Sequence, residues 1–155
     1  MNEINKILEF SKLEKQYAEE LRKLGESIKH PVLKTLFLSI AKDSEKHSLM
    51  YEAIHQVLTQ TQPFISEEEL KRIAQEIQKH IETEAKMLEE AEKILSSSQD
   101  PRIKLLASAI VEDEAKHHAL LQSIKKRIAE EETLSEKILW DMIWKDSPWH
   151  GTPGG

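Results

Sequence analysis

The sequence predicts an all-α protein: an up-down antiparallel four-helix bundle made of two repeated helical hairpins, with a short C-terminal helix after it. Three of the four glycines lie in the last five residues, so the rest of the chain lacks the turns that a β-sandwich or barrel needs. Glu, Lys, Leu, Ala and Ile fill long stretches that prolines at 31, 63 and 101 interrupt. The chain also repeats with a 70-residue period. Its 155 residues suit a single domain.

The first hairpin is predicted from apolar residues at helical spacing. They indicate a helix over residues 2–29 and a second helix from Pro31 to about Thr59. Proline suits the first turn of a helix, where its missing N–H is no loss. The link over residues 60–65 joins this hairpin to the next one.

The second hairpin begins at a helix-capping pattern. Ser66 and Glu69 form a capping box that opens a helix reaching about Leu95. Asp100 is a good N-cap for a fourth helix, which starts at Pro101 and continues to about residue 131. Short connections make neighbouring helices antiparallel. The sequence therefore predicts a bundle over residues 1–131, with repeat halves at about 1–60 and 66–131.

A shorter C-terminal helix is predicted within residues 132–146, and residues 147–155 read as a flexible tail. Trp140 and Trp144 lie four residues apart and form an apolar edge on this helix. Two interpretations stay open: the edge docks on the bundle itself, or it forms the contact of a homodimer.

Composition excludes several functions. Because 28 acidic residues outnumber 22 basic ones, nucleic acid is not expected as a partner. No run of eighteen apolar residues exists, so no membrane span is expected. The first residues lack the apolar stretch of a signal peptide, which makes the cytoplasm the expected location. The absence of cysteine rules out disulfides and thiolate metal sites.

One ionisable residue interrupts each apolar row that is predicted to face the core. Counted in sevens, the four rows are Ile7, Glu14, Leu21, Ile28; Leu33, Ile40, His47, Ile54; Leu70, Ile77, Glu84, Ala91; and Ile103, Ile110, His117, Ile124. Burying an unpaired carboxylate costs several kcal/mol. We therefore expect these four residues to be paired, protonated or bound to a ligand.

The four residues are predicted to lie at one depth. Glu14 precedes Pro31 by 17 residues and His47 follows it by 16, and Glu84 and His117 repeat this spacing about Pro101. At about 1.5 Å per residue, each lies roughly 25 Å from the turn of its own hairpin. In an up-down bundle both pairs converge near mid-height. Imidazoles and carboxylates at one buried level indicate a site for a first-row metal.

The residues around the two histidines extend this set. Glu114 and His117 form a Glu-x-x-His motif, whose members share one helix face. The 70-residue shift puts Ser44 at the position that matches Glu114.

With these motifs, residues 1 to about 131 resemble the ferritin-like superfamily, most closely the rubrerythrin and erythrin-type diiron-carboxylate proteins. The resemblance implies that Glu14 and His47 bind one metal, that Glu84 and His117 bind the other, and that Glu114 bridges them. It also implies two irons as cofactor, with manganese or zinc as alternatives. The sequence departs from the family at Ser44, where a second bridging glutamate is expected, and no rubredoxin domain is present.

The resemblance suggests further roles beside the ligands. Asp43 and Asp113 each precede a ligand histidine by four residues, and in bacterioferritins such aspartates accept a hydrogen bond from the other hairpin's histidine. Tyr17, one turn from Glu14, either packs as a core aromatic or hydrogen-bonds a ligand or bound oxygen species. His80 and His118 are expected on the surface.

The implied activity is redox chemistry on a small partner: oxidation of Fe(II), or reduction of peroxide or dioxygen. The residues do not choose between a ferroxidase and a rubrerythrin-like peroxidase, because both use the same ligands. Two other functions stay open. One is a metal-binding or storage module without turnover, which Ser44 makes credible, and the other is a structural or interaction bundle.

Overall fold

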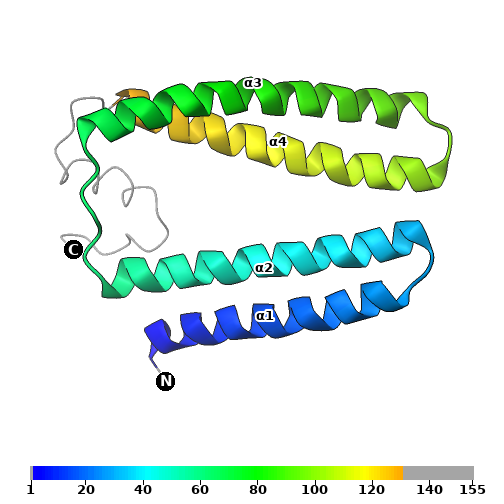
Figure 1. Ribbon diagram of the computed structural model, residues 1–155, viewed down its shortest axis with the longest axis horizontal. Helices are drawn as coiled ribbons and strands as arrows, with labels where there is room; N and C mark the ends of the chain where they lie inside the picture. Colours follow the sequence, from blue (N-terminus) through cyan, green and yellow to red (C-terminus); the bar gives the residue numbers. More distant parts are fainter. Residues whose placement is uncertain (1, 131–155) are drawn as a thin grey trace. The chain divides into compact units, whose positions relative to one another are not determined.

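A computed structural model describes residues 2–130, and it is all-helical over that range (Figure 1). The helices are α1 (Glu3–Ser27), α2 (Pro31–Thr59), α3 (Glu67–Ser97) and α4 (Pro101–Glu130). The all-α prediction is confirmed, and the predicted helix bounds agree within two residues. The predicted C-terminal helix with Trp140 and Trp144, and the tail 147–155, lie outside the described residues.

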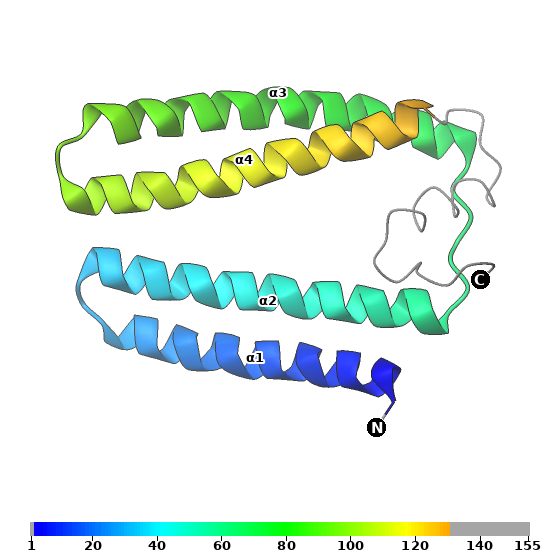
Figure 2. The same ribbon diagram turned by 180° about the vertical axis from the view of Figure 1, so that it is seen from behind.

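The helices pair as two hairpins, each a compact unit. Unit 1 comprises residues 1–63 and unit 2 begins at Phe64. In unit 1, α1 packs on α2, and in unit 2, α3 packs on α4 (Figures 1 and 2). Each pair runs antiparallel because a short turn joins its two helices.

The start of each helix in unit 2 is fixed by the residue predicted to cap it. Ser66 Oγ accepts a hydrogen bond of 3.1 Å from the Glu69 amide. Asp100 Oδ1 accepts one of 2.9 Å from the Arg102 amide, and its other oxygen pairs with the Arg102 guanidinium. These contacts stabilise the ionised form and lower the pKa of Asp100 to about 2. Both predicted caps are confirmed.

Small residues form the contact between α1 and α2. The buried residues are Ile7, Ser11, Ala18, Leu21 and Gly25 on α1, and Ala41, Ser44 and Ser48 on α2. Ser11 Oγ lies 2.9 Å from Ser48 Oγ, so the buried hydroxyls satisfy each other. Small side chains let the two backbones approach closely. At Gly25 a Cβ atom would lie only 3.0 Å from Leu38 Cδ2.

Larger apolar residues join α3 to α4. Leu70, Ile77, Ile81 and Ile128 form the core of unit 2, and Leu121 packs against it. Ala91 and Ala107 are buried between these helices as well. The two units are therefore built on one repeat but packed differently.

The rows predicted to face the core separate into two groups. Ile7, Leu21, Leu70, Ile77 and Ala91, from α1 and α3, are buried. Rows on α2 and α4 differ from the prediction, because Leu33, Ile40, Ile103, Ile110 and Ile124 are exposed. At 100° per residue, Ile40 lies about 100° around α2 from buried Ala41, and Ile110 lies about 60° around α4 from buried Ala107. A two-helix unit covers only one face of each helix, so each hairpin has an open apolar face.

Substituting Gly25 tests the close approach of α1 and α2. We expect Gly25→Val to lower the free energy of unfolding by about 1–3 kcal/mol, because the added methyl groups press against Leu38. Gly25→Ala should change it by less than about 1 kcal/mol, since the gain in helix propensity offsets a tight contact. Urea unfolding followed by circular dichroism measures both. Equal stability of the two variants contradicts the close approach.

Candidate metal centre

Three side chains of unit 2 converge at one level of the α3–α4 hairpin. Glu84 on α3 and Glu114 and His117 on α4 each offer one ligand atom, and these atoms all lie within 4.8 Å of one another. His117 Nδ1 is 3.8 Å from Glu84 Oε1. This spacing leaves room for one cation to contact all three groups with little movement.

Helix geometry produces this convergence. Glu114 and His117 lie three residues apart on α4, so they project from neighbouring points of one face. Glu84 and His117 lie at matching distances before and after the α3–α4 turn at Pro101, so antiparallel packing brings them level. The predicted grouping of these three residues agrees with the structure.

Glu84 and Glu114 each have one carboxylate oxygen that is buried. The Glu84 side chain is 18% exposed. Glu84 Oε2 and Glu114 Oε2 are both buried, and neither has a hydrogen-bond partner within residues 2–130. Buried acceptors are normally paired, and an unpaired one costs about 1–3 kcal/mol. A cation bound at this point would satisfy both oxygens.

The electrostatics of the pair also disfavour two free carboxylates. A hydrogen bond with Glu84, partial burial and the negative charge of Glu84 all raise the pKa of Glu114. The Glu114 carboxyl therefore holds its proton to a higher pH than an ordinary glutamate. A divalent ion would compensate the same charge.

Unit 1 contains only part of this arrangement. His47 Nδ1 lies 3.6 Å from Glu14 Oε1, with the Glu14 side chain 25% and the His47 side chain 48% exposed. Ser44, which corresponds to Glu114, is buried in the contact between α1 and α2. No three-ligand group surrounds Glu14 and His47 within residues 2–130. The predicted pair forms, and the third donor is missing from this unit.

The other predicted site residues lie beside the ligands. Asp43 pairs with Lys46 on its own helix at 3.2 Å. The charge of Asp113 contributes to the raised pKa of Glu114. Tyr17 is 51% exposed, so it does not pack as a core aromatic within unit 1. The bond expected from Asp43 or Asp113 to the other hairpin's histidine stays a prediction.

His118, which the sequence placed on the surface, is half-buried. Its Nδ1 atom is buried and has no hydrogen-bond partner among the described residues. The repeat contains a signal that identifies this position, because the 70-residue shift puts His118 on Ser48, which is fully buried in unit 1. His80, by contrast, is exposed as expected.

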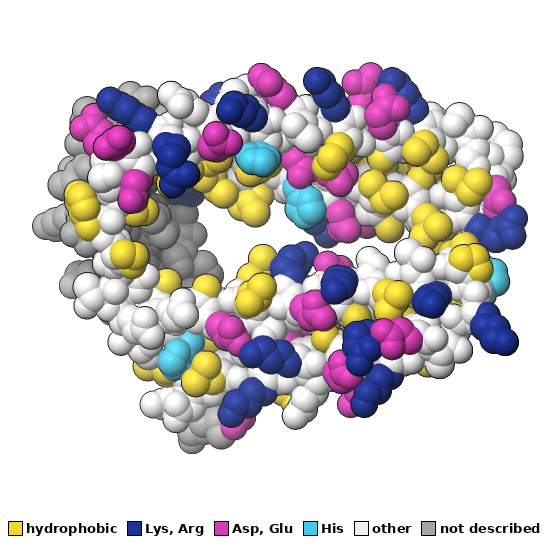
Figure 3. All heavy atoms as spheres, viewed as in Figure 1, with side chains coloured by type: hydrophobic (Ala, Val, Ile, Leu, Met, Phe, Trp, Pro, Cys, Tyr) yellow, Lys and Arg dark blue, Asp and Glu magenta, His cyan; other side chains and the backbone are white. Residues whose placement is uncertain are grey.

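Figure 3 shows histidine and carboxylate side chains beside one another over α3 and α4, with hydrophobic side chains on either side. None of the described helices combines the length and apolar character needed to cross a membrane.

Comparison with family models, curated proteins and solved structures finds no match to this chain.

Removing the charge of one of the two opposed carboxylates should stabilise the metal-free protein. In metal-free protein, Glu114→Gln should raise the free energy of unfolding at pH 7 by about 1 kcal/mol, because an amide can donate to Glu84. Glu112→Gln, at an exposed position on the same helix, is the matched control and should change it by less than about 0.5 kcal/mol.

The stability gained by Glu114→Gln should depend on pH, because the pKa of Glu114 is raised in the folded state. Because the folded-state pKa of Glu114 is raised, its protonated form stabilises the fold below the unfolded pKa near 4.5. That contribution is lost as the pH rises through the folded-state value. The advantage of Glu114→Gln should therefore grow upward from about pH 4.5. A pH-independent difference contradicts the opposed pair.

Proposed function

We propose that this protein is a ferritin-like metal protein that binds iron through Glu84, Glu114 and His117, with Glu14 and His47 as a second, weaker half-site. The observation that carries the proposal is the convergence of two carboxylates and an imidazole, with two buried oxygens unpartnered. The ferritin-like assignment rests on the Glu and Glu-x-x-His pattern of the sequence.

The donor set suits a first-row divalent ion. Two carboxylates neutralise a 2+ charge, and imidazole favours iron or zinc over calcium or magnesium. Binding would replace the proton that the raised pKa of Glu114 favours, so uptake should release a proton and strengthen with pH. These residues fit the metal that the sequence resemblance implies.

We propose that the two hairpins close on each other along their open apolar faces as an up-down four-helix bundle. This closure would bring Glu14 and His47 to the metal ligands of unit 2. Ile40 on α2 and Ile110 on α4 occupy equivalent positions in the repeat, and both are exposed beside the buried contact of their hairpin. Burying such rows is favourable by about 25 cal/mol per Å². In such a bundle Glu14 and His47 would lie level with Glu84 and His117, because both pairs are equally far from the turn of their own hairpin.

We infer that the two half-sites differ in affinity. Unit 2 supplies three donors, whereas unit 1 supplies two, because the Ser44 hydroxyl cannot bridge cations as a carboxylate does. One ion should therefore bind tightly and a second one weakly.

Iron, when bound, would supply the electrons for reduction of dioxygen or peroxide. Glu84 and Glu114 would hold it by charge, and His117 would supply a nitrogen donor. Ferroxidase and rubrerythrin-like peroxidase activities both fit this arrangement, and a homodimer contact through Trp140 and Trp144 remains a further proposal.

A second candidate function is metal storage without turnover. The buried Ser44 favours it, because a single tightly held ion lacks the bridged partner of a diiron centre. Rapid mixing of Fe(II)-loaded protein with dioxygen or peroxide separates the two. Oxidation faster than in the Glu114→Gln variant supports catalysis, and equal rates support storage.

Metal titration provides the direct test. We expect one Co²⁺ or Fe²⁺ per chain to bind tightly under anaerobic conditions, and His117→Gln to weaken it at least about tenfold through loss of a donor. His80→Gln, at an exposed histidine of the same unit, is the matched control and should stay within about twofold of wild type.

His47→Gln should leave this first ion in place and affect only the weaker second one. Calorimetry and the Co²⁺ absorption spectrum measure both affinities. The absence of binding to the wild-type chain, or equal effects of His117→Gln and His80→Gln, overturns the proposal.

A further inference from the structure

A groove runs along unit 2 past Ile81, which lies one helical turn from Glu84. Two hollows of about 420 and 470 Å³ share Gln78 and Lys125 as lining residues. Their volumes fall within the range of roughly 300–1,000 Å³ that is typical of small-molecule sites. The groove therefore has room for a small ligand.

Most of its lining surface is apolar, and its polar side chains are positive or neutral. No carboxylate among the described residues lines the groove. Its lining comprises Ile81, Ala74, three lysines and three glutamines: Lys71, Gln75, Gln78, Gln122, Lys125 and Lys126. This composition is unusual for a protein with 28 acidic and 22 basic residues. A cluster of ammonium and amide donors favours a compact anion.

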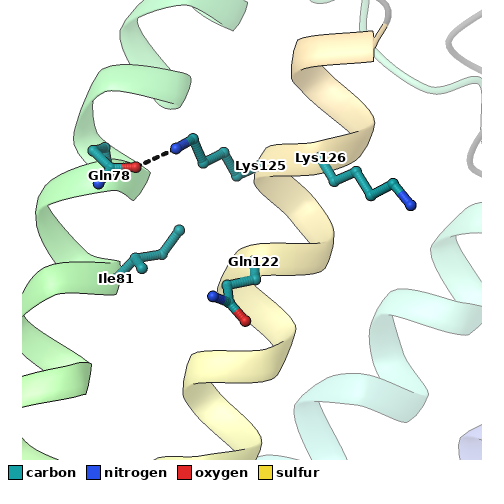
Figure 4. A pocket seen from close by; sticks show the side chains of 5 residues that line it. All are labelled: Gln78, Ile81, Gln122, Lys125 and Lys126. Carbon is teal, nitrogen blue, oxygen red and sulfur yellow. Dashed lines mark hydrogen bonds between the residues drawn. The ribbon is translucent and has the colours of Figure 1, made fainter.

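The side chains are arranged around the opening between α3 and α4. Figure 4 shows Lys125 of α4 directed at Gln78 of α3, with Ile81 and Gln122 beside them, while Lys126 points away. The Lys125 ammonium donates to the Gln78 side-chain oxygen and is thereby held across the groove. Lysine otherwise loses considerable rotamer freedom on binding, so this contact prepares the charge for a ligand.

Two carboxylates outside the lining shape its charge. Glu82 Oε1 accepts a hydrogen bond of 3.1 Å from Gln78 Nε2, and Glu67 lies 3.6 Å from the Lys71 ammonium. The first contact fixes the Gln78 amide so that its oxygen faces Lys125. Lys71 is partly neutralised by Glu67, which makes Lys125 the principal charge of the groove.

We propose that this groove binds a phosphate group, carried either by free inorganic phosphate or by a small phosphomonoester. Lys125 would provide the main charge, and the Gln122 and Gln75 amides would donate hydrogen bonds to the remaining oxygens. This proposal is independent of the metal centre, although Gln122 lies only one helical turn from His118.

The test titrates the full-length, metal-free chain with inorganic phosphate at low ionic strength, followed by amide chemical shifts. We expect saturable shifts at Gln78 and Gln122. Lys125→Gln should weaken binding at least about fivefold, because it removes the principal charge. Lys104→Gln removes an exposed charge about 30 Å along the same helix and should change it by less than about twofold.

A second variant keeps the contact across the groove and reverses the charge beside it. Gln78→Glu can still accept from Lys125, so helicity should be unchanged while phosphate binding is lost. Glycerol phosphate binding more tightly than inorganic phosphate indicates a phosphomonoester, and the reverse order indicates the free ion. Equal weakening by Lys125→Gln and Lys104→Gln, or saturable shifts only elsewhere, overturns the proposal.

Discussion

The opposition of two carboxylates inside the α3–α4 hairpin is the constraint on which the functional account of unit 2 depends. Glu84 and Glu114 occupy places that an apolar residue would fill at lower cost, and each has a buried oxygen with no partner among residues 2–130. Proton retention by Glu114 relieves the repulsion only in part. A cation bound between the two carboxylates and His117 would compensate both charges, so the proposed metal binding would also stabilise this hairpin.

The sequence predicted the helices and most of the ligand group because both depend on local spacing. Pro31 and Pro101 mark two helix starts, and counting from them put Glu84 level with His117. Leu33 and Ile110 lie outside the contact within each hairpin, since period alone does not tell which of two apolar faces meets the partner helix. His118 was misjudged for the same reason, although its equivalence to buried Ser48 was available in the repeat.

The two units of the repeat have different polar side chains at equivalent buried positions. In unit 1, Ser11 and Ser48 hydrogen-bond within a close contact of small residues, and Ser44 is buried there without charge. In unit 2, the positions equivalent to Ser44 and Ser48 are Glu114 and His118, and both have buried polar atoms without partners. Unit 1 thus satisfies its polar groups internally, while unit 2 leaves them available to a ligand.

Anomalous diffraction from crystals grown with Co²⁺ tests the central claim most directly. The account predicts a strong anomalous peak about 2.0–2.2 Å from a carboxylate oxygen of Glu84, an oxygen of Glu114 and a nitrogen of His117. Because all three ligands belong to α3 and α4, that peak should appear however the two hairpins are arranged. Ordered carboxylates with no anomalous density between them, or a peak bound only by other residues, would contradict the account.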